Sequence, residues 1–124
     1  MGLDCDNNIT IVCDNQEQLN TIYNKYFNGQ NPEFCKIKSM NENMIKVWLY
    51  SRNVPYIDLP QEILQNYTQT WVKLEWLCEN GKSGICVGGY KSNIYYPYRT
   101  FDWDDLCIEE RFMYSTESNK RLRT

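Results

Sequence analysis

Hydrophobic side chains alternate with polar ones over several short stretches of this chain, which is the pattern of a half-buried β-strand. The first stretch is residues 8–13, where Ile9 and Ile11 point to the same side. Two further stretches, residues 34–40 and 44–50, are separated by the short polar turn Asn-Glu-Asn. A turn of this length favours an antiparallel hairpin. We therefore expect three strands in the first half of the chain.

The hydrophobic period changes after the first of these strands. From Leu19 to Phe27 the apolar residues recur three and four positions apart, which places them on one face of an α-helix. Asp14 is expected to cap the start of this helix, with Glu17 completing a capping box, and Gly29 to end it. A strand followed directly by an amphipathic helix is typical of a layered α+β or α/β domain.

Residues 71–90 predict a second hairpin, around which we expect the rest of the chain to pack. Val72 and Leu74 lie on the apolar face of its first strand, and Asn-Gly at residues 80–81 suits its turn. The turn also contains the Gly-Lys-Ser run of a phosphate-binding loop. We reject that function because Trp76 stands where such a loop needs glycine, and because a strand rather than a helix follows.

A short helix is expected before this hairpin, beginning at Asp58 with Pro60 in its first turn. The elements then follow the order β-α-β-β-α-β, which predicts a ferredoxin-like split arrangement. This is an α+β antiparallel sheet with two helices on one face, here with an added C-terminal hairpin strand and extension. The length predicts a single domain over residues 1–124, with a frayed tail at 115–124.

Composition places the chain among globular proteins. Hydrophobic residues make up 42% of it and aromatic residues 15%, and no apolar run approaches the roughly 20 residues of a membrane span. No basic segment followed by an apolar one opens the chain, so we expect a cytoplasmic protein without a membrane partner. The formal net charge of −3 argues against nucleic acid as a partner over the whole surface.

The chain has six cysteines and no histidine. The cysteines are widely spaced and form no Cys-x-x-Cys pair, so we expect reduced, buried thiols rather than disulfides or a zinc site. The absence of histidine removes the usual serine and cysteine triads, together with the commonest general base near neutral pH. We therefore expect no catalytic residues, no metal, no cofactor and no enzymatic activity.

The most distinctive candidate site is the aromatic and acidic segment that follows Tyr90. Tyrosine and tryptophan are favoured at the centres of protein interfaces, and an acidic rim favours a basic partner. We predict that this segment docks a protein partner or a second copy of the chain; the alternative is that its aromatic residues cover the sheet as core. The predicted partner-binding residues are Tyr95, Tyr96, Tyr98, Asp102, Trp103, Asp104 and Asp105.

Two other functions stay open. Single-stranded nucleic acid could stack on aromatic residues of the sheet face, with Trp48, Tyr50, Trp71 and Lys46 as its contacts, although no basic groove is evident in the sequence. Carboxylates could instead serve an enzyme as metal ligands or as an acid–base pair, although acidic clusters in loops are usually solvated. The carboxylates in question are Asp102, Asp104, Asp105 and Glu109.

Two runs of the sequence are similar to one known family. The run CDNNITIVCDNQEQLNTIYNKYF, residues 5–27, resembles the opening of the YubB ferredoxin-like domain found in plasmid- and phage-encoded proteins. Residues 45–90 resemble its second half, with a strand, a proline-containing loop, a short helix and two strands around a Glu-x-Gly-like turn. The matching residues are Cys5, Asn7, Glu79, Gly81, Gly84 and Gly88.

The chain departs from this family in two places. Asn53-Val-Pro-Tyr56 replaces the Trp-x-Pro-Pro loop of the family, and Asn80 shifts the spacing of the Glu-Gly turn. The resemblance implies a ferredoxin-like fold and a viral or mobile-element origin. It brings no established activity and no catalytic residues.

Overall fold

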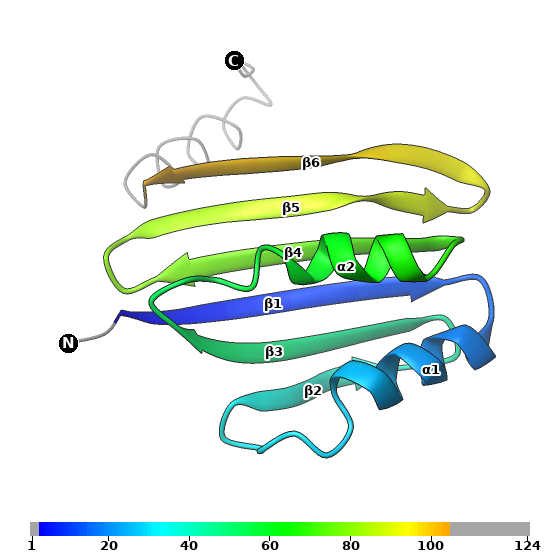
Figure 1. The fold of residues 1–124 in the computed structure, drawn as a ribbon, viewed down its shortest axis with the longest axis horizontal. Coiled ribbons are helices and arrows are strands. Elements are labelled where there is room, and N and C mark those ends of the chain that lie inside the picture. Colours follow the sequence, from blue (N-terminus) through cyan, green and yellow to red (C-terminus); the bar gives the residue numbers. More distant parts are fainter. Residues whose placement is uncertain (1–2, 105–124) are drawn as a thin grey trace, which may run out of the picture.

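Residues 3–104, the part of the chain that the computed structural model describes, fold into one antiparallel sheet with two helices (Figure 1). The strands are hydrogen-bonded in the order β2-β3-β1-β4-β5-β6, so the first strand lies inside the sheet. The elements are β1 (Asp4–Cys13), α1 (Gln16–Tyr26), β2 (Cys35–Met40), β3 (Met44–Arg52), α2 (Leu59–Asn66), β4 (Thr70–Cys78), β5 (Lys82–Lys91) and β6 (Ile94–Asp104).

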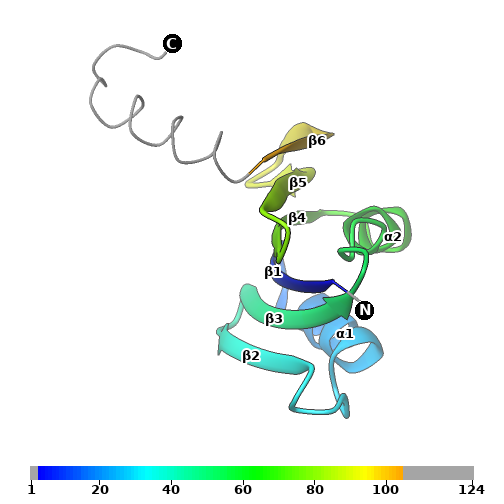
Figure 2. The ribbon, with the colours of Figure 1, turned by 90° about the vertical axis from the view of Figure 1, so that its left-hand side faces the viewer.

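Both helices lie on the same face of the sheet (Figure 2). Helix α1 packs against β1 and helix α2 packs against β4, while β6 lies beyond the helices at one edge (Figure 1). The opposite face is covered by no helix of residues 3–104, and we call it the open face (Figure 2). Neither helix in this part of the chain is long and apolar enough to cross a membrane.

The hydrophobic core lies between the helices and the face of the sheet that they cover. Alternate residues of β1, β3 and β4 point into it, as the sequence predicts, and meet the apolar stripes of the two helices. Burying each large aliphatic side chain contributes about 1.5–3 kcal/mol. The largest fully buried aliphatic side chains are Ile9, Ile11, Leu19, Ile22, Ile45, Val47, Ile63, Val72 and Leu74.

The start of α2 follows the prediction, whereas both ends of α1 differ from it. The side chain of Asn15 accepts a hydrogen bond from the backbone N–H of Gln18 at 2.7 Å, so Asn15 rather than the predicted Asp14 is the N-cap of α1. Phe27 is the C-cap of α1, so Gly29, which has a left-handed φ of 82°, lies two residues beyond the cap and not directly after it as predicted. Helix α2 begins after Asp58 with Pro60 in its first turn, as predicted.

The predicted ferredoxin-like split β-α-β-β-α-β arrangement is wrong for this chain. The structure is a six-stranded antiparallel sheet with two helices, and only the general α+β class holds. Residues 94–104, which we expected to form an extension, instead form β6 and pair with β5. The sequence concealed this strand because aromatic residues occupy both of its faces, so hydrophobic alternation gives no signal there.

Several residues that carry the resemblance to the YubB family have structural roles. The fully buried Asn7 side chain donates hydrogen bonds to Leu49 O at 3.1 Å and Ser51 Oγ at 2.9 Å, and accepts one from Tyr56 N at 2.9 Å. It thereby ties β1 to β3 and to the loop that follows β3. The Glu79 carboxylate accepts a hydrogen bond from the backbone N–H at the start of β1.

The sequence prediction of reduced thiols is wrong for Cys5 and Cys78. These residues face each other on β1 and β4 and form a buried disulfide between the two central strands, at the end where β1 begins and β4 ends. The sequence did not suggest the pair because 73 positions separate the two cysteines, which meet only through the strand register. Cys13, Cys35 and Cys86 are free, and Cys107 lies outside the described residues.

The cytoplasmic location expected from the sequence stays a prediction. The Cys5–Cys78 disulfide weighs against it, because disulfides persist mainly in oxidising compartments.

Reduction of the Cys5–Cys78 disulfide should lower the free energy of unfolding by about 2–4 kcal/mol, because the bond restricts the unfolded chain over a long loop. Urea unfolding with and without a reductant measures the change. The Cys5→Ala/Cys78→Ala double variant is the control and should not respond to reductant. A wild-type protein that unfolds identically under both conditions would show that the thiols are not cross-linked in solution.

Replacing the buried amide of β1 should destabilise the fold. We expect Asn7→Ala to cost about 2–3 kcal/mol, since it removes hydrogen bonds at three positions and leaves buried polar groups without partners. The neighbouring Asn8 is exposed, so Asn8→Ala should change stability by less than about 0.5 kcal/mol. Urea unfolding of both variants checks this, and equal losses would refute the role of Asn7.

Candidate functional site

Strand β6 carries predicted site residues on both of its faces. Its register against β5 shifts between Val87 and Gly89, because Val87 pairs with Arg99 while Gly89 pairs with Tyr96. β6 therefore contains one extra residue at this point, which is a β-bulge that interrupts the alternation of side chains. As a result Tyr95 and Tyr98 lie on the helix side of the sheet, and Tyr96 lies on the open face.

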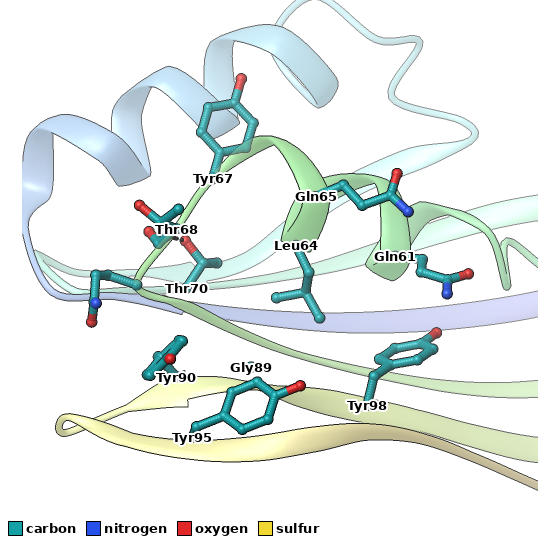
Figure 3. Close-up of a pocket in the computed structure, with 11 residues that line it drawn as sticks. Gln61, Leu64, Gln65, Tyr67, Thr68, Thr70, Gly89, Tyr90, Tyr95 and Tyr98 are labelled. Atoms are coloured by element: carbon teal, nitrogen blue, oxygen red, sulfur yellow. Dashed lines mark hydrogen bonds between the residues drawn. The ribbon is translucent and has the colours of Figure 1, made fainter.

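A groove of about 270 Å³ lies on the helix side, between α2 and the strands β5 and β6 (Figure 3). No charged side chain of the described residues lines it. We call it the tyrosine–glutamine groove because of the side chains that dominate its wall. It is lined by Tyr67, Tyr90, Tyr95 and Tyr98, by Gln61, Gln65 and Gln69, and by Leu64, Thr68, Thr70 and Gly89.

Tyr98 forms the inner wall of this groove, where its ring rises from β6 toward α2 (Figure 3). Its hydroxyl is buried and has no hydrogen-bond partner among residues 3–104. Burial raises the pKa of Tyr98 well above its ordinary value, and the nearby Cys86 thiol and Asp58 carboxylate act in the same direction.

Two glycines allow the strands around the groove to approach each other. A Cβ at Gly88 would lie 2.5 Å from the Cα of Tyr98, so only glycine lets β6 pass this close to β5. Gly89 has a φ of 112°, and a Cβ there would collide with the carbonyl oxygen of Thr70. The local sequence Gly-Gly therefore makes both the bulge and the groove possible.

The open face carries a row of positive charges that runs across the strands. Thr10 of β1 pairs with Lys46 of β3 on one side and with Lys73 of β4 on the other. In the same way, Val87 of β5 pairs with Lys73 and with Arg99 of β6. Because residues that pair directly share a face, the three cations stand in one line at intervals of about 10 Å, two strand spacings. We call Lys46, Lys73 and Arg99 the cation row.

Aromatic side chains flank the cation row on both sides. One neighbouring row contains Trp71 and Tyr96, and the other contains Trp48 and Phe101. Trp71, Trp48 and Phe101 each lie two residues, about 7 Å, along the strand from a cation, and Tyr96 lies three residues from Arg99 because of the bulge. Trp71, Tyr96 and Arg99 also line a second hollow, of about 460 Å³.

The predicted site residues have separate positions in the structure. Tyr95 is 57% exposed and Tyr96 is 43% exposed, so these two rings do not form core, whereas Tyr98 packs partly against it. Asp102 is exposed on β6. Trp103 and Asp104 belong to β6, but their side chains lie outside the description, as does the whole of Asp105.

The structure gives no support to a metal-dependent carboxylate site within residues 3–104. No three metal-ligating side chains come together in that range. Asp105 and Glu109, which the enzyme hypothesis also uses, lie outside it.

Sequence reasoning missed the glutamines of the groove and most of the cation row. Gln61, Gln65 and Gln69 are four residues apart, and this spacing could have indicated one face of α2 and its end. Lys73 and Arg99 gave no such signal, because only the register between distant strands places them beside Lys46.

Comparison of the chain with known protein families, with characterised proteins and with solved structures finds no match to any of them. The resemblance to the YubB family, and the viral or mobile-element origin that it implies, therefore stay predictions.

Removing the hydroxyl of Tyr98 should not destabilise the protein at neutral pH. We expect Tyr98→Phe to leave the free energy of unfolding unchanged or to raise it by up to about 1 kcal/mol, because this buried group has no partner. Urea unfolding near neutral pH measures the difference. A clear loss of stability would show that the hydroxyl is hydrogen-bonded.

Tyr98→Phe should also change how the stability of the protein depends on pH in alkaline solution. The pKa of Tyr98 is higher in the folded chain than in the unfolded chain, where it is about 10. Below a pH of about 10 the tyrosine is neutral in both states and does not reduce the free energy of unfolding. As the pH rises above this value, the unfolded chain releases the proton first, so the free energy of unfolding falls. Tyr98→Phe should therefore lose less stability than wild type between pH values of about 9 and 11. Parallel losses in the two proteins would contradict the burial of this hydroxyl.

Proposed function

We propose that this protein is a non-enzymatic interaction module whose tyrosine–glutamine groove binds an extended segment of a partner protein. The observation that carries the proposal is the wall of the groove, which combines tyrosine rings with side-chain amides and contains no charged side chain of the described residues. Rings supply contact area at little cost in side-chain entropy, and amides both donate and accept hydrogen bonds. Such a wall suits a peptide backbone with uncharged side chains.

The position of the groove next to an unpaired sheet edge supports an extended ligand. Strand β6 pairs with β5 on one side and with no other strand of the described residues. Pro97 and the bulge weaken strand pairing at the first part of this edge, whereas residues 99–104 pair regularly with β5 and with no other described strand. A bound segment would gain main-chain hydrogen bonds there and place side chains in the groove.

Acidic residues stand at the α2 start of the groove and favour a basic residue in the partner. Asp58 precedes α2 and lies close enough to Tyr98 to raise the pKa of that side chain. Asp102 is exposed further along β6 and pairs with Gly84. We therefore expect the bound segment to be uncharged over the groove and basic where it reaches these carboxylates.

Loss of an exposed ring from the groove should weaken this binding. Selection from a library of random peptides of about ten residues would supply a ligand, and titration calorimetry would measure its affinity. We expect Tyr95→Ala to lower the affinity for the selected peptide at least about tenfold, because central tyrosines contribute most of the binding energy at such interfaces. Tyr56 is exposed outside the groove, so Tyr56→Ala is the matched control and should bind as wild type.

Two results would overturn the proposal. One is that no peptide is enriched, and the other is that enriched peptides bind Tyr95→Ala and wild type equally well. The groove could instead be filled by a second copy of the chain, which light scattering of the free protein tests. If wild type is a dimer and Tyr95→Ala is a monomer, a second copy of the chain fills the groove.

A further inference from the structure

The charges of this protein are distributed unevenly over its two faces. The net charge of the chain is −3, yet the open face carries the whole cation row. Two further cations lie on the same face, since Lys36 pairs with Trp48 and the ammonium of Lys91 lies over the Trp71 ring. This face therefore attracts anions although the molecule as a whole is acidic.

The acidic groups of the open face do not cancel this charge. Asp6 accepts a hydrogen bond from the indole N–H of Trp48 at 3.0 Å, and Asp4 accepts one from the hydroxyl of Tyr50. Both carboxylates belong to the first half of β1, whereas the cation row crosses β1 at Thr10. Among residues 3–102, Glu75 forms the one ion pair with the row, 3.7 Å from Lys73, and this exposed pair has little strength.

Two tryptophans of the open face, Trp48 and Trp71, each have a lysine against the ring. The ammonium of Lys91 lies 4.6 Å from the ring centroid of Trp71, and that of Lys36 lies 5.6 Å from the ring centroid of Trp48. An aromatic surface beside a cation matches the two parts of a nucleotide, a base that stacks and a phosphate that carries charge. The repetition of this pair on two strands suits a polymer of nucleotides.

We propose that the open face binds single-stranded nucleic acid. The cation row contacts phosphates, and the aromatic side chains of the two flanking rows stack on bases. The chain of the ligand runs across the strands, along the line from Lys46 to Arg99. This site lies on the opposite face from the tyrosine–glutamine groove, and its proposed contacts do not depend on the function proposed for that groove.

The geometry favours a single strand over a duplex. Within residues 3–104 no helix or ribbon projects from the open face, so this part of the chain has no element there to enter a major groove. Stacking also requires bases that are unpaired and turned outward, which only a single strand provides. Among residues 3–102 the half-buried Trp48 and Trp71 and the exposed Tyr96 and Phe101 offer faces of this kind.

Fluorescence anisotropy with labelled oligonucleotides of about 12 nucleotides tests the proposal on the full chain. The probes are oligothymidylate, oligouridylate, a DNA duplex of the same length and an abasic strand with the same number of phosphates. We expect one or both single strands to bind, with the stronger of the two identifying DNA or RNA as the ligand. The duplex and the abasic strand should bind at least about tenfold more weakly.

Variants separate the contribution of charge from that of stacking. For Lys46→Gln/Lys73→Gln, the slope of log affinity against log salt should fall by about 1.4, at 0.7 for each lost phosphate contact. Trp71→Ala should weaken binding about tenfold and leave the salt slope unchanged. Lys25→Gln/Lys82→Gln removes the same charge outside the cation row and should bind as wild type.

Three outcomes would overturn the proposal. They are absence of binding at a low salt concentration of about 20 mM, equal binding of the abasic strand, and equal losses in the two double-lysine variants. A thermal melt of each variant checks its fold, so that loss of binding is not confused with unfolding. Tyr95→Ala should leave oligonucleotide binding intact, which separates this test from that of the tyrosine–glutamine groove.

Discussion

The structure depends on the register of β1, which is hydrogen-bonded to a strand on each side. Ile9 and Ile11 are fully buried against the helices, and a shift of one residue would turn both side chains toward solvent. Core packing therefore fixes which residues of β3 and β4 stand opposite each residue of β1. The alignment of Lys46 with Lys73 through Thr10 on the open face is a consequence of burial on the other face.

The second half of the sheet depends on a different constraint, the close approach of β5 and β6. Gly88 admits the backbone of β6 where any side chain would collide with Tyr98, and the neighbouring bulge changes the face to which the following residues point. One irregularity thus divides a continuous run of tyrosines between two surfaces. The helix side receives a neutral aromatic wall, and the open face receives rings that stand beside cations.

Local patterns in the sequence predicted most elements, because short-range periodicity and turn chemistry determine them. Ile9 and Ile11, the Asn-Gly turn and Pro60 each indicated the element that the structure contains. Local patterns do not predict contacts between residues that are far apart in the sequence. Cys5 meets Cys78, and Lys73 aligns with Arg99, only because of the register in which their strands pair. The predicted residues Tyr95, Tyr96 and Tyr98 all lie on β6, but their division between two faces depends on a bulge that no local pattern indicates.

The Cys5–Cys78 disulfide closes residues 5–78 into a covalent ring, and the two-stranded ribbon β5–β6 lies outside this ring. The ring contains α1, β2, β3 and α2 with most of β1 and β4, whereas β5 and β6 follow Cys78 and lie outside it. Apart from the peptide chain that continues from Cys78, the contacts among residues 3–104 that hold β5 and β6 to the ring are hydrogen bonds and side-chain packing. Both proposed surfaces combine residues of the ring with residues of the ribbon, so each ligand would fasten the ribbon to the ring from its own side.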